Sequence, residues 1–175
     1  MFLVNQCCRC RSTIAWVNSE PMVTKTLADG EPALWFEMRF NVPARVLWKH
    51  LTDPEKLKYW FPCELDILPR KGAVVTFKFP GEKATEGTVL EAEKPRLLAY
   101  TWEEEVLRWE IEDDDDGSLL TLTNTIQEGQ EIARSAAGWH LTLMGLDDYL
   151  NKRPLGQDPA LWDEYVRRYE EQFGE

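Results

Sequence analysis

The sequence predicts an α+β domain in which a curved antiparallel sheet of about six or seven strands packs against one long C-terminal helix. Three observations lead to this fold class. Segments of alternating apolar and polar residues follow one another through most of the chain, as β-strands do. The connections between them are short, which favours antiparallel pairing over parallel crossovers. A long segment with helical periodicity then follows near the end of the chain.

The length of 175 residues suits one domain with its own core. Residues 1–21 contain Cys and Arg but no clear period, so we expect a disordered leader there. The regular pattern begins at Met22, which leaves both Met1 and Met22 open as the native start. We expect the folded domain over residues 22–153 and a helical extension over residues 154–175.

Composition excludes several classes of function. The net charge of −11 argues against nucleic acid and anionic membranes as partners, because an acidic surface repels phosphate groups. No apolar run approaches the length of a membrane span. Cys7, Cys8 and Cys10 have no fourth ligand at the spacing of a zinc site, so we expect no metal and no cofactor. Because the four cysteines form no disulfide framework, we expect a cytoplasmic protein.

The first regular elements are a strand and two short helices. After the turn signal Asp29-Gly30, apolar residues alternate with others over residues 34–40, which predicts a half-buried strand. Pro43 then ends the strand, and apolar residues at helical spacing predict a helix over residues 44–51. The run 52–55, Thr-Asp-Pro-Glu, is typical of the start of a second short helix, which carries Leu57, Trp60 and Phe61.

A meander of strands follows. Alternation predicts strands over residues 75–79, 87–92, 97–102, 107–112 and 120–126. The acidic run from Asp113 ends in Asp116-Gly117, a strong hairpin signal, so the last two strands should pair directly. Alternation also implies one dry and one wet face of the sheet.

The long helix is expected over residues 130–150. Its core-facing stripe repeats at steps of four and three: Ile132, Ala136, Trp139, Leu143, Leu146 and Leu150. Gly138 and Gly145 each cost about 1 kcal/mol of helix propensity, which a close backbone approach would explain. Asp158-Pro159 then begins a last amphipathic helix, which we expect to pack on the outside or on a second subunit.

The order and spacing of several short motifs resemble one known family. They are Val46-Leu47-Trp48, Leu51-Thr52-Asp53-Pro54, Trp60-Phe61-Pro62, Gly87-Thr88-Val89, the run 95–102 (Pro-Arg-Leu-Leu-Ala-Tyr-Thr-Trp), Leu120-Thr121-Leu122-Thr123, and Ala136-Ala137-Gly138-Trp139 with Leu146. Over residues 34–150 the chain resembles the START-like (SRPBCC) superfamily, in the branch of homologues of the heat-shock chaperone ATPase activator. This resemblance implies the helix-grip fold and a cavity between helix and sheet, but no single reaction, because relatives include carriers, receptors, cyclases and chaperone regulators.

Nine residues are candidates to line such a cavity. Trp60 and Phe61 are expected near its mouth, and aromatic residues on the inner parity of the strands, with Met144, are expected inside it: Phe77, Tyr100, Trp102, Trp109 and Met144. The simpler interpretation of each is core packing.

Asn124 and His140 are the polar candidates. Asn124 falls on the apolar parity of its strand, so its amide must bond either the backbone or a ligand. His140 lies one step round the helix from Trp139, where it could orient a ligand, although a surface or core histidine is the simpler interpretation.

These observations favour binding of a small hydrophobic molecule, in stress response or regulation, over catalysis. The chain contains no phosphate loop and no nucleophile elbow. A chaperone ATPase-stimulating or other protein-interaction module is one alternative, and a chaperone or a homodimer partner remains open. A polyketide cyclase or dehydratase is the other, and it would need an acid–base pair for which only His140 is visible.

Overall fold

The computed structural model describes residues 20–127, 131–154 and 159–174. Its eight strands form one antiparallel sheet in the order β1-β2-β8-β7-β6-β5-β4-β3. The strands are β1 Met22–Ala28, β2 Glu31–Phe40, β3 Glu64–Ile67, β4 Val74–Lys78, β5 Thr85–Glu93, β6 Leu97–Trp102, β7 Glu105–Asp114 and β8 Gly117–Thr125. The helices are α1 Ala44–Thr52, α2 Pro54–Leu57, α3 Ile132–Leu150 and α4 Pro159–Phe173.

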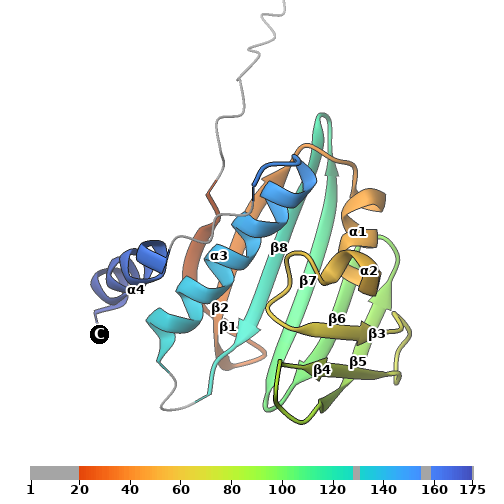
Figure 1. Cartoon of the computed structure of the whole chain (residues 1–175), viewed down its shortest axis with the longest axis horizontal. Helices are drawn as coiled ribbons and strands as arrows, with labels where there is room; N and C mark the ends of the chain where they lie inside the picture. The colour runs from red at the N-terminus through yellow and green to blue at the C-terminus, as the bar shows by residue number, and fades with distance from the viewer. Residues whose placement is uncertain (1–19, 128–130, 155–158, 175) are drawn as a thin grey trace, which may run out of the picture.

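The α+β class and the helix-grip plan predicted from the sequence are confirmed. Figure 1 shows α3 lying across one face of the curved sheet, with α4 beside it at the β1 edge. The sheet has two strands beyond the six expected from alternation. The first, β1, buries only Val23, because an edge strand packs on few neighbours and needs no regular alternation. The second, β3, has only four residues, too few for its period to stand out.

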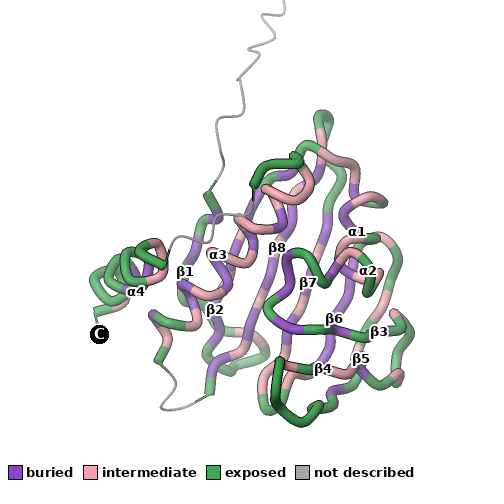
Figure 2. Tube along the Cα trace, in the orientation of Figure 1, coloured by how far each residue is buried: buried purple, intermediate pink, exposed green. Residues whose placement is uncertain are grey.

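The predicted dry face of the sheet is present. In β8 the residues at 118, 120, 122 and 124 are buried, and their neighbours at 119, 121, 123 and 125 are half-buried. Figure 2 shows buried residues along the central strands of the sheet, including β6, β7 and β8, and along α3. Four of the six residues of the stripe expected on α3, Ala136, Trp139, Leu143 and Leu146, are buried, and Ile132 and Leu150 at its ends are half-buried.

Two glycines are required by close approach of neighbouring strands. A Cβ at Gly117 would lie 2.1 Å from the carbonyl oxygen of Phe40, and one at Gly87 would lie 1.9 Å from that of Thr101. The predicted hairpin at Asp116-Gly117 forms, with Asp114 paired to Gly117. The last residue of that signal is therefore a glycine because β2 lies against it, rather than because the turn needs a positive φ.

The acidic hairpin also supports α1. The backbone N–H of Ala44 donates to Asp113 Oδ1 at 2.8 Å, which satisfies an unpaired donor at the start of the helix. In α2, Asp53 caps the helix by accepting from the backbone N–H of Glu55 at 3.0 Å. Helix α2 ends at Leu57, so Trp60 and Phe61 lie in the turns after it.

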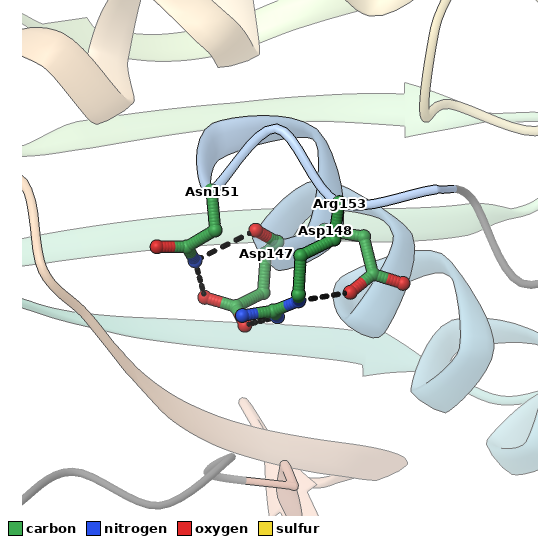
Figure 3. Close-up of polar contacts among 4 residues, drawn as sticks. All are labelled: Asp147, Asp148, Asn151 and Arg153. Atoms are coloured by element: carbon green, nitrogen blue, oxygen red, sulfur yellow. Dashed lines mark hydrogen bonds and ion pairs between the residues drawn. The ribbon is translucent and has the colours of Figure 1, made fainter.

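The C-terminal end of α3 is held by a small polar cluster (Figure 3). Asn151 donates through Nδ2 to the backbone oxygen of Asp147 at 2.8 Å, and Arg153 Nε donates to Asp148 Oδ1 at 2.7 Å. Arg153 also pairs with Asp147. Carboxylates in a last helical turn oppose the helix dipole, so the guanidinium offsets an unfavourable arrangement.

The helix expected after Asp158 is α4. It packs on α3 and reaches back to β1, where Gln172 Nε2 donates to the carbonyl of Val23 at 2.8 Å. Residues 1–19, which hold Cys7, Cys8, Cys10 and nearly all of the expected leader, lie outside the described residues, as does Gln130 at the expected start of α3. Within the described residues, no helix is long and apolar enough to cross a membrane.

Candidate functional site

A layer of aromatic rings occupies the space between α3 and the sheet. The rings of Phe77 and Trp102 stack with centroids 4.8 Å apart, and those of Trp109 and Trp139 meet edge to face at 5.6 Å. Phe61 lies 6.0 Å from Trp139 by centroid. These distances are typical of aromatic packing, so these rings pack on one another as part of the core.

An open cleft of about 380 Å³ remains at one end of the layer, beside the β6–β7 turn and the N-terminal half of α3. It is lined by Pro62, Phe79, Trp102, Glu103, Glu105, Asn124, Ser135, Gly138, Trp139 and Thr142. The helix contributes three small residues to the lining, Ser135, Gly138 and Thr142, whose side chains occupy little space. The volume is in the range of small-molecule sites.

A chain of hydrogen bonds crosses the floor of this cleft. The indole N–H of Trp139 donates to Asn124 Oδ1 at 2.9 Å, and Asn124 Nδ2 donates to Glu105 Oε2 at 2.7 Å. The second amide hydrogen has a partner in the carbonyl of Thr125 at 2.9 Å. Asn124 is buried, so each bond satisfies a group that would otherwise be costly, and together they fix the orientation of its amide.

The cleft is apolar and acidic. Its walls include the rings of Trp102, Trp139 and Phe79, and its charged lining residues are Glu103 and Glu105. Among the lining residues that the structure describes, none is Lys, Arg or His. The described lining therefore offers apolar contact with aromatic rings beside acidic side chains.

Two of the nine predicted site residues, Trp102 and Asn124, line the cleft. Five others lie on the same side of α3, within the core. Among these, Trp109 donates through Nε1 to the hydroxyl of Tyr100 at 3.2 Å, so the polar groups of these two side chains are partners inside the protein. The five are Trp60, Phe61, Phe77, Tyr100 and Trp109. Phe77, Tyr100 and Trp109 were expected to line a cavity, and the structure places all three within the packed core.

His140 and Met144 face away from the cleft, which corrects their expected position. His140 Nδ1 lies 2.6 Å from the hydroxyl oxygen of Tyr169, and its ring lies 4.0 Å from that of Tyr165. The hydroxyl of Tyr165 lies 3.5 Å from the sulfur of Met144. Successive helical residues are separated by about 100°, so the step from Trp139 to His140 moves the side chain to the α4 side.

Burial lowers the pKa of His140 to about 4. Glu20, which pairs with Arg168, opposes this shift, and Arg168 adds to it. His140 is neutral at pH 7 and lies outside the cleft, so the acid–base residue on which a cyclase interpretation depended is not at this site.

Several lining residues were not expected from the sequence. Glu103 and Glu105 enter through the tight β6–β7 turn, where Glu103 has a positive φ of 54°. Trp139 was expected only to pack in the core. It packs on Trp109 and also borders the cleft. The signal that could have located the helix wall was the spacing of small residues at 135, 138 and 142. A Cβ at Gly138 would meet Trp162 at 3.8 Å, an ordinary contact, so close approach does not explain that glycine.

Comparisons with known proteins agree with this architecture. The profile of the family described as Activator of Hsp90 ATPase homolog 1-like protein matches residues 41–151, more than half of the chain. No curated protein matches the chain.

Solved structures share the fold. A conserved protein of unknown function, EF2215 from Enterococcus faecalis, has a TM-score of 0.75 at 19% identity, over 87% of this chain and 90% of that one. CalU16 from Micromonospora echinospora has a TM-score of 0.68 at 22% identity, over 89% and 96%. A protein encoded by gene BPP1335 of Bordetella parapertussis has a TM-score of 0.66 at 19% identity, over 89% and 93%.

Proposed function

The chain belongs to the family of Activator of Hsp90 ATPase homolog 1-like proteins, and from this premise we propose that it binds a small, largely hydrophobic molecule in the cleft beside α3. The observation that carries the proposal is the cleft itself: about 380 Å³ bordered by indole and phenyl rings on an otherwise packed aromatic layer. The site is at the end of the sheet-to-helix space rather than in its centre.

The aromatic rings that border the cleft are preorganised by contacts within the protein. Trp102 stacks on Phe77 and meets Trp139 edge to face at a centroid distance of 6.0 Å. Trp139 is further fixed through its bond to Asn124. Because these rings already have their partners, binding would cost little side-chain entropy, which favours affinity.

The energetics favour a ligand with one or two rings. Burial of about 200 Å² of apolar surface would contribute about 5 kcal/mol before the cost of association. With this contribution alone, the dissociation constant would be no lower than about 0.2 mM, so tighter binding requires polar contacts. The polar residues in the lining include Glu103, Glu105, Asn124 and Thr142.

The test is native mass spectrometry of the protein purified from its own cells, followed by extraction and identification of any bound compound. Thr142→Phe should fill part of the cleft and abolish the adduct. The matched control Thr121→Phe places the same side chain on the half-buried outer face of β8, away from the cleft, and should retain the adduct. An adduct that survives Thr142→Phe, or a preparation that carries only a bound protein partner, would contradict the proposal.

A further inference from the structure

We propose that helix α4 is an acid-released cover on α3, which separates from the folded helix-grip domain as a unit when His140 gains a proton. The proposal does not depend on ligand binding in the cleft. It rests on the enclosed environment that α4 builds around the imidazole ring of His140.

The imidazole of His140 is closed off between α3 and α4, and its exposed fraction is 0%. Its Nδ1 lies 2.6 Å from the hydroxyl oxygen of Tyr169, and its ring centroid lies 4.0 Å from that of Tyr165. Among the described residues, Nε2 has no hydrogen-bond partner. A neutral imidazole has one N–H donor, whereas a protonated one has two. With α4 in place, protonation would therefore bury a charged ring with an N–H at Nε2 that has no acceptor, which is costly.

The charged groups around the ring do not compensate for a proton on it. Glu20, in the segment before β1, attracts a charged imidazole, but this carboxylate accepts a bond from Arg168 of α4 at 2.8 Å and one from the hydroxyl of Tyr165 at 3.2 Å. Arg168 itself repels a charged imidazole. On β1, Lys25 lies at the far end of α4, where its amino group donates to the carbonyl of the last helical residue. Burial has the largest effect and lowers the pKa of His140 to about 4.

Among the groups that surround the ring, His140 is the one whose charge should change between pH 8 and pH 5. The bond from Arg168 lowers the pKa of Glu20 below its ordinary value, and burial raises the pKa of both Tyr165 and Tyr169. The carboxylate therefore stays charged and the tyrosines stay neutral over this range. Once α4 separates, His140 is in water and regains an ordinary pKa of about 6.5. The open form binds the proton first as the pH falls, so acid shifts the equilibrium toward it.

Helix α4 is attached mainly through one side, as Figure 1 shows. Its buried residues are Tyr165, Val166 and Tyr169, and it packs on α3. At the sheet it contacts the edge strand β1, where Gln172 bonds to the carbonyl of Val23. The aromatic layer on the other side of α3 is formed by rings from the strands, from α3 and from the turns after α2. Because an element held by few buried residues opens at a lower free energy than the whole domain, α4 should separate while this layer stays packed.

The experiment is hydrogen exchange with mass spectrometry on the full chain without ligand, at several pH values from 8 to 5. After correction for the intrinsic exchange rate at each pH, the opening equilibrium of the α4 amides should be about 30-fold larger at pH 5 than at pH 8. At every pH, the α4 amides should also be at least about tenfold less protected than those of β7 and β8. This second comparison separates local release from unfolding of the whole domain, and it needs no variant.

Two substitutions of His140 test its role. His140→Gln removes the titrating group and keeps a polar side chain, and His140→Leu repeats the test with an apolar one. In each, the opening of α4 should change by less than about twofold between pH 8 and pH 5. The matched control is His50→Gln, which changes the other histidine of the chain, a half-buried residue of α1. It should retain the response of about 30-fold. Circular dichroism establishes that each variant is folded.

Three results would overturn the proposal. The first is equal protection of the α4 amides at pH 8 and pH 5, or an acid response that survives in both His140 variants. The second is equal protection of α4, β7 and β8, because α4 would then separate only when the whole domain unfolds. The third is loss of the acid response in His50→Gln, which would assign the response to the other histidine.

Discussion

The two sides of α3 are both buried, but they are built differently. On the sheet side, Trp139 packs within a layer of rings, and its indole N–H and the amide of Asn124 have partners. On the α4 side, His140 has one partner, Tyr169, and its Nε2 is the one buried side-chain nitrogen or oxygen without a partner in the part of the chain that the structure describes.

This difference separates two kinds of burial. The sheet side is closed by packing and by satisfied polar groups, and the space left at its end is a shaped cleft. The α4 side is closed by a helix that places a neutral histidine between two tyrosines. We expect the first side to dominate stability at neutral pH and the second to make stability depend on acid.

The largest effect is expected for Trp139→Ala. The change removes a ring that contacts Trp102 and Trp109 and leaves Asn124 without a donor. Urea unfolding should show a loss of about 3–5 kcal/mol. Trp162 is a half-buried residue on the α4 side, so Trp162→Ala should reduce the free energy of unfolding by clearly less. Equal losses would mean that the two sides contribute alike.

Low pH should destabilise the folded protein mainly through His140 on the α4 side. The pKa of His140 is lowered to about 4 by burial, so the unfolded chain binds a proton first as the pH falls below 6.5. Stability should therefore decline from pH 6.5 to about 4, by up to about 3 kcal/mol relative to His140→Leu. Unfolding in urea at several pH values measures this difference, because the carboxyl groups titrate in both proteins. Parallel curves for the two proteins would contradict the assignment.

A smaller loss is expected for Asn124→Ala, about 1–3 kcal/mol in urea unfolding, because the Trp139 N–H is left buried without a partner. The control is Ser118→Ala, which removes a single buried bond from Oγ to the carbonyl of Val42 at 2.7 Å. Its loss should be about 1 kcal/mol. If Asn124→Ala cost no more than Ser118→Ala, the hydrogen-bond chain would not be a stabilising unit.

The smallest effect is expected for Tyr169→Phe. The ring remains stacked on Phe173 while the hydroxyl that meets His140 is lost. We expect about 1 kcal/mol of destabilisation at pH 7 by thermal or urea unfolding. Tyr149→Phe, on a half-buried side chain stacked on Tyr59, is the matched control and should be nearly neutral.

Most of the fold could be read from the sequence, whereas only part of the site could. Alternation located six strands, and helical spacing located α3, because burial on one face imposes a period on local sequence. The edge strand β1 was missed because it buries only Val23, and β3 was missed because its four residues are too few for their alternation to stand out. Trp102 and Asn124 were identified from the sequence because each lies on the inward-facing parity of its strand, where an aromatic ring or an amide either packs in the core or lines a site.

The rest of the site depends on contacts between distant segments. Glu105 belongs to the cleft because the β6–β7 turn carries it to the start of α3, and nothing in its neighbours indicates this. His140 and Met144 could not be assigned to a side of α3, because two adjacent sides of that helix are buried and the second is covered by α4.

The sequence by itself therefore determined most of the elements, their order, the dry face of the sheet and the family. These follow from local periodicity and motif spacing, which a linear chain carries in full. Only the tertiary structure decided where empty volume remains, which carboxylates border it and which side of α3 is covered by α4. Those features depend on how large side chains fill a shared space, and packing of that kind is a property of residues far apart in the chain.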